Sequence, residues 1–146
     1  ILSKTIKHPI FQKFIDGDEV SIDCYVNIVG KCKILMRYRK SVNLGESEHI
    51  VFFKNKIIYS TIEKIINKLP FCGHVMFQGI ISKGVFHMLE CNPRVGGASA
   101  TCYHKGLDSF FEFINDNLNI KNNKFYKSKL AKNNSFFLHK TITAID

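Results

Sequence analysis

Residues 19 to 28 alternate strictly between polar and apolar side chains. Val20, Ile22, Cys24, Val26 and Ile28 fall on one face of an extended chain, and Glu19, Ser21, Asp23, Tyr25 and Asn27 fall on the other. A period of two over ten residues predicts a half-buried antiparallel strand, with one face on a core and the other towards solvent. The turn signal Asp16-Gly17-Asp18 precedes this strand.

The rest of the chain predicts further strands and a few helices. Isoleucines at helical spacing predict a helix over 56–69, and a hairpin is expected around Lys83-Gly84. Gly106 suits the end of a helix and Asp108 the start of the next. The remaining expected elements are strands over 9–15, 32–39, 49–53, 74–82, 85–92 and 136–142, a polar loop over 40–48, and helices over 98–105 and 109–118. Together they predict an α+β fold, an antiparallel β-sheet with helices packed on one face.

Length and composition indicate one domain or part of one. The chain has 146 residues, is 45% hydrophobic, and has no apolar run near the ~20 residues of a membrane span. Five scattered cysteines without a C-x-x-C pair favour reduced thiols and a cytoplasmic location. Because the chain begins with Ile and lacks a signal-peptide pattern, we expect a fragment or a processed product.

The net charge of +9 leaves a nucleic-acid-binding module open as an alternative function. The excess is concentrated in a Lys- and Asn-rich tail over 119–146, which we separate from a subdomain over 1–118. The tail lysines are Lys121, Lys124, Lys127, Lys129, Lys132 and Lys140. We disfavour nucleic acid, because no helix-turn-helix pattern, aromatic strand motif or zinc knuckle accompanies the charge.

The run Glu90-Cys91-Asn92-Pro93-Arg94-Val95-Gly96-Gly97 carries the strongest functional signal. Alternate residues of a strand share a face, so Glu90 and Asn92 are expected to point the same way, with Arg94 close by. Carboxylate and amide oxygens suit Mg²⁺, and a guanidinium suits phosphate oxygens. The competing interpretation is a polar strand end at a turn.

Gln78 lies mid-strand, where a polar side chain needs a partner. A three-residue loop over 83–85 would place Gln78 directly opposite Glu90, whereas a two-residue loop would place the two side chains on opposite faces. A metal site that uses both residues therefore predicts the three-residue loop.

Three further groups of residues have a functional interpretation beside a structural one. Arg37 and Arg39 share a strand face and make a credible phosphate clamp, with a solvated strand edge as the alternative. Glu19 and Asp23 also share a face and could bind ribose hydroxyls, an amine or lysines. The tripeptide Gly45-Glu46-Ser47 is a weak anion-binding signal.

In this order and spacing, the motifs resemble the C-terminal half of the ATP-grasp fold, in particular the branch of the carbamoyl-phosphate synthase large chain and biotin carboxylase. The segments that carry the resemblance are FQKFIDGDEVSID at 11–23, RYR at 37–39, GES at 45–47, FQG at 77–79 and ECNPRVGG at 90–97. The resemblance covers about residues 9 to 114.

The resemblance implies an ATP-dependent ligase that acts through an acyl phosphate. Glu90 would bridge two Mg²⁺ ions (Mn²⁺ could substitute), with Asn92 and Gln78 as further metal ligands and Arg94 on the transferred phosphoryl group. Glu90, Asn92 and Arg94 would thus be catalytic. Nucleotide contacts would come from Gln12, Lys13, Phe14 and Ile15 as the adenine hinge, and from Glu19, Arg37 and Arg39.

The resemblance also implies partners. The substrates would be ATP, a small carboxylate or bicarbonate, and an amine nucleophile, with no membrane and with a homo-oligomer left open. Related sequences often have Glu in the hinge, where this one has Gln12-Lys13, and no Gly-rich phosphate loop precedes Phe11. We therefore expect the chain to be inert without the N-terminal half of the ATP-grasp unit. A non-catalytic remnant used for assembly is the remaining alternative.

Overall fold

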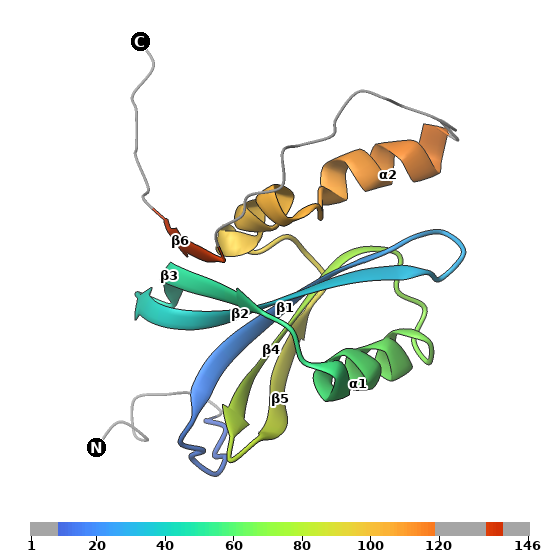
Figure 1. The fold of residues 1–146 in the computed structure, drawn as a ribbon. Helices are drawn as coiled ribbons and strands as arrows, with labels where there is room; N and C mark the ends of the chain where they lie inside the picture. The colour runs from blue at the N-terminus through green and yellow to red at the C-terminus, as the bar shows by residue number, and fades with distance from the viewer. Residues whose placement is uncertain (1–8, 119–133, 139–146) are drawn as a thin grey trace.

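The computed structural model describes residues 9–118 and 134–138, which form one antiparallel sheet with helical segments (Figure 1). The strands lie in the order β5-β4-β1-β2-β3-β6. Their bounds are β1 Asp18–Val26, β2 Cys32–Asn43, β3 Glu46–Phe53, β4 Gly73–Ser82, β5 Val85–Asn92 and β6 Ser135–Phe137. The helical segments are α1 Lys56–Ile66, the 3₁₀ segment η2 Gly97–Lys105, and α2 Ser109–Leu118.

The α+β class and the antiparallel sheet are confirmed, but helical segments pack against both faces of the sheet rather than one (Figure 1). β1 is accordingly buried on both faces from Val20 to Val26, so the half-buried strand expected there is wrong in this respect. The alternation itself holds: Ile22, Cys24 and Val26 join one core cluster and Tyr25 joins the other.

On the first face, α1 covers the centre of the sheet. Asn55 begins the helix, since its side chain accepts hydrogen bonds from the backbone N–H groups of Ile57 and Ile58. The expected helical spacing is confirmed by Ile58, Ile62 and Ile66, which are buried together with β1, β2 and β4 residues. The helix ends at Ile66, three residues short of the expected boundary.

On the second face, η2 and α2 follow the end of β5. Gly106 ends η2 in a left-handed conformation, with φ of 88°, and the Asp108 carboxylate accepts from the Phe111 N–H at 3.0 Å at the start of α2. Tyr25 on β1 donates to the Asp116 carboxylate at 2.7 Å, which ties α2 to the sheet.

Two hairpins have the same kind of turn. Leu44-Gly45 and Lys83-Gly84 each have two residues with positive φ, which is the geometry that tight two-residue hairpins require. The polar loop expected over 40–48 is therefore wrong, because β2 continues to Asn43 and β3 begins at Glu46. The three-residue loop over 83–85 is also wrong, because Ser82 pairs with Val85.

The two ends of the described chain differ in secondary structure. The strand expected over 9–15 is absent: the segment has no regular secondary structure, and Ile10, Phe11 and Phe14 are exposed. At the other end, β6 pairs with the edge strand β3. The rest of the lysine-rich tail, including most of the strand expected over 136–142, lies outside the described residues. No helix in the described ranges is long and apolar enough to cross a membrane.

Candidate functional site

A row of polar side chains crosses four strands on the face covered by η2. Glu90 on β5 is paired with Gln78 on β4, Gln78 with Ser21 on β1, and Ser21 with Arg37 on β2. Because directly paired residues point to the same face, the antiparallel register brings these four side chains side by side. The next row includes Asn92, Met76 and Asp23.

Gln78, Glu90 and Asn92 converge at the β5 end of this row. The Asn92 amide nitrogen lies 2.9 Å from Glu90 Oε1 and 3.3 Å from Gln78 Oε1. The Gln78 amide is in direct contact with the Glu90 carboxylate. With its nitrogen towards Glu90, Gln78 donates to the carboxylate and accepts from Arg39 Nη1 at 3.1 Å. With its oxygen towards Glu90, two acceptor oxygens would face each other, so the orientation with the nitrogen towards Glu90 is the one that satisfies both side chains.

Arg39 forms the rim of the site next to Gln78. Its Nη1 lies 3.1 Å from Glu19 Oε2, Nε donates to Ser47 Oγ at 3.0 Å, and Nη2 donates to the Gly45 carbonyl at 2.6 Å. The guanidinium side chain is only 12% exposed. The expected nucleotide contacts Glu19 and Arg39 therefore lie together, and the Leu44-Gly45 hairpin orients Arg39.

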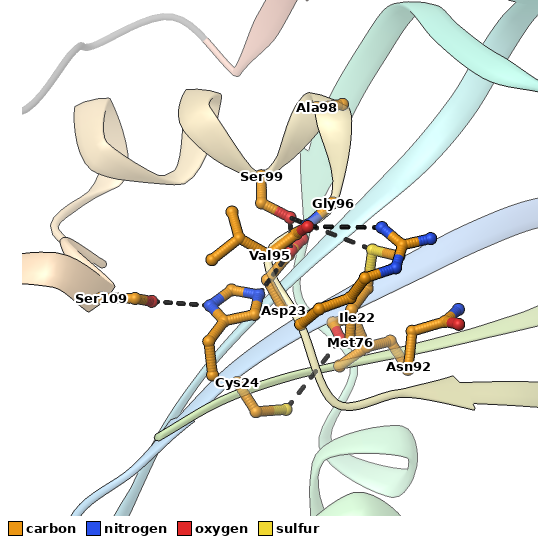
Figure 2. A network of polar contacts seen from close by, with 12 residues as sticks. Ile22, Asp23, Cys24, Met76, Asn92, Val95, Gly96, Ala98, Ser99 and Ser109 are labelled. Atoms are coloured by element: carbon orange, nitrogen blue, oxygen red, sulfur yellow. Dashed lines mark hydrogen bonds and ion pairs between the residues drawn. The ribbon is translucent and has the colours of Figure 1, made fainter. Parts of the chain in front are cut away.

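Below this surface lies a buried ion pair. Arg37 Nε donates to Asp23 Oδ2 at 2.8 Å, and both residues are 1% exposed or less. Figure 2 shows Ser99 of η2 pointing at Asp23, to which its hydroxyl donates. The Ser99 hydroxyl also accepts from the Gly96 N–H at 3.0 Å. His74 Nε2 approaches Asp23 Oδ1 at 3.4 Å. Asp23 thus connects β1, β2, β4 and η2.

The surroundings of Asp23 keep it ionised. Burial by itself raises the pKa of a carboxyl group, but the Arg37 guanidinium and the neighbouring His74 and Ser99 side chains lower the pKa of Asp23 to about 2. A permanent negative charge at this point compensates Arg37, so that Arg37 can stay buried beside the site. The expected phosphate clamp thus consists of a partly exposed Arg39 and a buried, paired Arg37.

The strand end after Asn92 turns sharply towards η2. The Arg94 N–H donates to the Asn92 carbonyl at 2.8 Å, and the exposed Arg94 side chain donates only to the Val95 carbonyl, at 3.3 Å, in the described residues. Gly96 is buried, and a Cβ there would lie 2.7 Å from Met76 Sδ. A side chain at this position would require the Met76 side chain to move.

A small cavity of about 130 Å³ lies between the polar row, Arg39 and the loop that follows Asn92. Arg37, Arg39 and Arg94 line it together with Glu46, Gln78, Ser21 and Ser47. Ser21 is 1% exposed and its hydroxyl has no hydrogen-bond partner in the described structure. The lining side chains carry three guanidiniums against one carboxylate, and with the unpartnered Ser21 hydroxyl this makes the cavity suited to an anion.

The expected hinge residues are not part of this cavity. Gln12, Lys13 and Phe14 are exposed in the segment before β1, and Ile15 is partly buried. Sequence reasoning also missed Ser99, His74 and the partner role of Asp23. A polar residue in the middle of an alternating strand was the available signal for Asp23, but its partners lie 14 and 76 residues further along the chain.

Gln78, Glu90 and Asn92 are residue types that can ligate a divalent cation. These residues supply one carboxylate and two amides from adjacent strands, and because both amide nitrogens now face Glu90, the amides would turn their oxygens inwards to bind a cation. Among the described residues no three His, Cys, Asp or Glu side chains gather at one point. Mg²⁺ accepts one or two carboxylates and completes its shell with water and phosphate oxygens, so these residues fit Mg²⁺ held jointly with a polyphosphate.

Comparison with known proteins identifies a family and a fold. Residues 5–133 match the model of a protein family described as ATP-grasp in the biosynthetic pathway with the Ter operon. A comparison with curated protein sequences gives no significant match.

Three solved structures share the fold at low identity. The ATPase subunit of phosphoribosylaminoimidazole carboxylase from Aquifex aeolicus gives a TM-score of 0.62 at 15% identity over 75% of this chain and 35% of that one. The biotin carboxylase domain of Hydrogenobacter thermophilus 2-oxoglutarate carboxylase gives a TM-score of 0.61 at 12% identity over 81% of this chain and 28% of that one. That structure is a complex with MgADP, ADP and bicarbonate. L-amino acid ligase from Bacillus licheniformis gives a TM-score of 0.52 at 18% identity over 70% of this chain and 30% of that one. The chain thus spans about a third of these structures or less.

Proposed function

The chain belongs to the ATP-grasp family of the biosynthetic pathway with the Ter operon, and on this premise we propose that it forms the magnesium- and phosphate-binding wall of an ATP-dependent ligase. The observation that carries the proposal is the convergence of Gln78, Glu90 and Asn92 beside a cavity lined by three guanidiniums. Cation ligands next to anion ligands are what a magnesium-bound polyphosphate requires.

In this proposal Glu90, Asn92 and Gln78 hold Mg²⁺, and Mn²⁺ can replace it. Bound Mg²⁺ supplies charge neutralisation on the nucleotide phosphates. Arg94 contacts the transferred phosphoryl group, and Arg39 adds positive charge to the lining of the same cavity. The Asp23 carboxylate holds Arg37, and Ser99 anchors the loop that carries Arg94.

The proposed reaction has two displacements. An oxygen of a carboxylate or of bicarbonate attacks the γ-phosphorus of ATP, and ADP leaves, which gives an acyl phosphate. An amine or ammonia then attacks the acyl carbon, and inorganic phosphate leaves. Preorganised guanidiniums favour both steps, because negative charge accumulates on the phosphoryl oxygens. The complex of the 2-oxoglutarate carboxylase domain with MgADP and bicarbonate supports this choice of ligands.

The exposed segment before β1 supports a further part of the proposal. Phe11 and Phe14 are 81% and 85% exposed, which is unusual for aromatic side chains in a finished site. We assign Gln12 to Ile15 as a hinge that contacts adenine once the rest of the nucleotide site is present. The chain alone is therefore expected to show no ATP turnover, and turnover at a rate typical of whole enzymes would contradict this part.

The test measures binding of Mn²⁺ and ADP to the full chain by electron paramagnetic resonance. Glu90→Gln and Asn92→Ala are each expected to weaken ADP-dependent Mn²⁺ binding about tenfold, since each removes an oxygen ligand. Glu63→Gln on α1, on the other face of the sheet, is the matched control and should bind as the unmodified chain does. If both site variants were folded by circular dichroism and bound Mn²⁺ as tightly as the unmodified chain does, the metal assignment would be refuted.

A further inference from the structure

A second and larger cavity opens beside the N-terminal end of α1. Its volume is about 800 Å³, and it shares no lining residue with the anion cavity. It lies between the beginning of β2, the end of β3 and the first turns of α1. Its apolar walls are formed by Ile34, Leu35, Met36, Phe52, Phe53 and Tyr59. A volume of this size with aromatic and aliphatic walls is typical of pockets for small molecules.

The rim of this cavity carries charge of one sign. Lys54, Lys56 and Lys105 line it, and no acidic residue is among its described lining residues. Lys54 and Lys56 are exposed. Asn55 lies between them and caps α1, so the positive end of the helix dipole faces the same rim. The rim therefore has a positive potential above an apolar interior.

We propose that this cavity binds a soluble small molecule that combines an apolar body with a carboxylate. The body would lie against Phe52, Phe53 and Tyr59, and the carboxylate would lie at Lys54 and Lys56. The proposal goes beyond the ligase function, because it uses none of the residues that line the anion cavity.

The test compares two probes of equal chain length and opposite charge on the full chain. Decanoate is expected to bind in calorimetric titrations and decyltrimethylammonium is not, because the rim attracts anions. The affinity for decanoate should fall as salt is raised. In methyl nuclear magnetic resonance spectra, decanoate should shift the signals of Ile34, Leu35 and Met36 and leave that of Ile80, on β4, unchanged.

Two variants locate the charge. The double variant Lys54→Glu/Lys56→Glu should weaken decanoate binding about tenfold or more, since two favourable charges become unfavourable. Lys64→Glu/Lys68→Glu makes the same charge change near the other end of α1 and should leave binding unchanged. Glu90→Gln should also leave it unchanged, so failure here and failure of the ligase proposal are distinguishable.

Three results would overturn the proposal. Decyltrimethylammonium could bind as well as decanoate, or the shifted methyl signals could lie away from the cavity. Alternatively, the chain could sediment with phosphatidylglycerol vesicles in a manner that depends on Lys54 and Lys56 while decanoate does not bind, which would assign this surface to a membrane instead.

Discussion

Gln78 lies directly opposite Glu90 on the neighbouring strand, although the turn between their strands contains only two residues. A two-residue turn by itself would pair Gln78 with Leu89 and point Glu90 to the other face. A β-bulge corrects the register: Gly79 pairs with Met88, Gln78 pairs with Glu90, and Leu89 is the extra residue on β5. The candidate metal site therefore depends on an irregularity of the sheet.

The first prediction concerns the bulge. In Gly79→Ala, the added Cβ would collide with the His87 carbonyl oxygen and the Phe86 ring, so the β4–β5 ladder must shift. We expect a loss of about 1–3 kcal/mol in the free energy of unfolding, measured by urea denaturation, and weaker ADP-dependent Mn²⁺ binding.

Gly84→Ala is the matched control for this change. It lies in the same hairpin, a Cβ there meets no atom within 4 Å, and its φ of 79° leaves only backbone strain. This variant should lower the free energy of unfolding by about 1 kcal/mol and leave Mn²⁺ binding intact. If Gly79→Ala bound Mn²⁺ as well as Gly84→Ala does, the role of the bulge would be wrong.

The second prediction concerns the charge of the metal site. Gln78→Glu places two carboxylates directly opposite each other. Without divalent cations this should lower the free energy of unfolding by up to about 1 kcal/mol, and with it the thermal midpoint. Because a cation between the carboxylates relieves this repulsion, Mg²⁺ should raise the midpoint of the variant more than that of the unmodified chain. A midpoint that does not respond to Mg²⁺ would show that the two side chains do not share a cation.

The third prediction concerns the buried ion pair. Asp23→Asn leaves the Arg37 guanidinium buried without a counter-charge and should cost about 3–5 kcal/mol, measured by denaturant unfolding. Asp18→Asn removes a carboxylate that pairs with Lys40 at 2.9 Å at the surface and should cost less than about 1 kcal/mol. Similar costs for the two variants would contradict the structural role of Asp23.

The fourth prediction is a pH dependence that follows from the same residue. The pKa of Asp23 lies near 2 in the folded chain and near its ordinary value of 3.8 in the unfolded chain. Its stabilisation is therefore present above about pH 4 and is lost as the pH falls towards 2, by roughly 2 kcal/mol. Asp23→Asn should lack this part of the acid dependence. An unchanged acid slope would mean that other carboxylates cause it.

The fifth prediction concerns the attachment of α2. Tyr25→Phe removes the hydrogen bond to Asp116 and should cost about 1 kcal/mol. Hydrogen exchange should become faster in α2, which then keeps two polar contacts with the sheet among the described residues, Glu112 with Lys33 and Ser109 with His74. Tyr59→Phe, at a residue of α1 that lines the larger cavity, is the control and should leave exchange in α2 unchanged.

Local causes account for the elements that could be predicted. The isoleucine spacing of α1, the Asp108 cap, Gly106 at the end of η2 and the tight turn at Lys83-Gly84 each depend on a few neighbouring residues. The alternation in β1 likewise separated Ile22 from Tyr25. The hairpin at Leu44-Gly45 was missed, because its turn lacks the Asn-Gly or Asp-Gly pair that usually marks such a hairpin.

By itself the sequence determined which residues share a strand face, and hence that Glu90 and Asn92 lie close together and that Arg37 and Arg39 point the same way. Only the tertiary structure decided that Arg37 is buried on Asp23 and that Gln78 faces Glu90. The first depends on η2, which covers a strand face that would otherwise be in water, and the second depends on a bulge that reverses every side chain beyond it. Side-chain period is a local property of the backbone, whereas burial and register are set by contacts between segments distant in the chain.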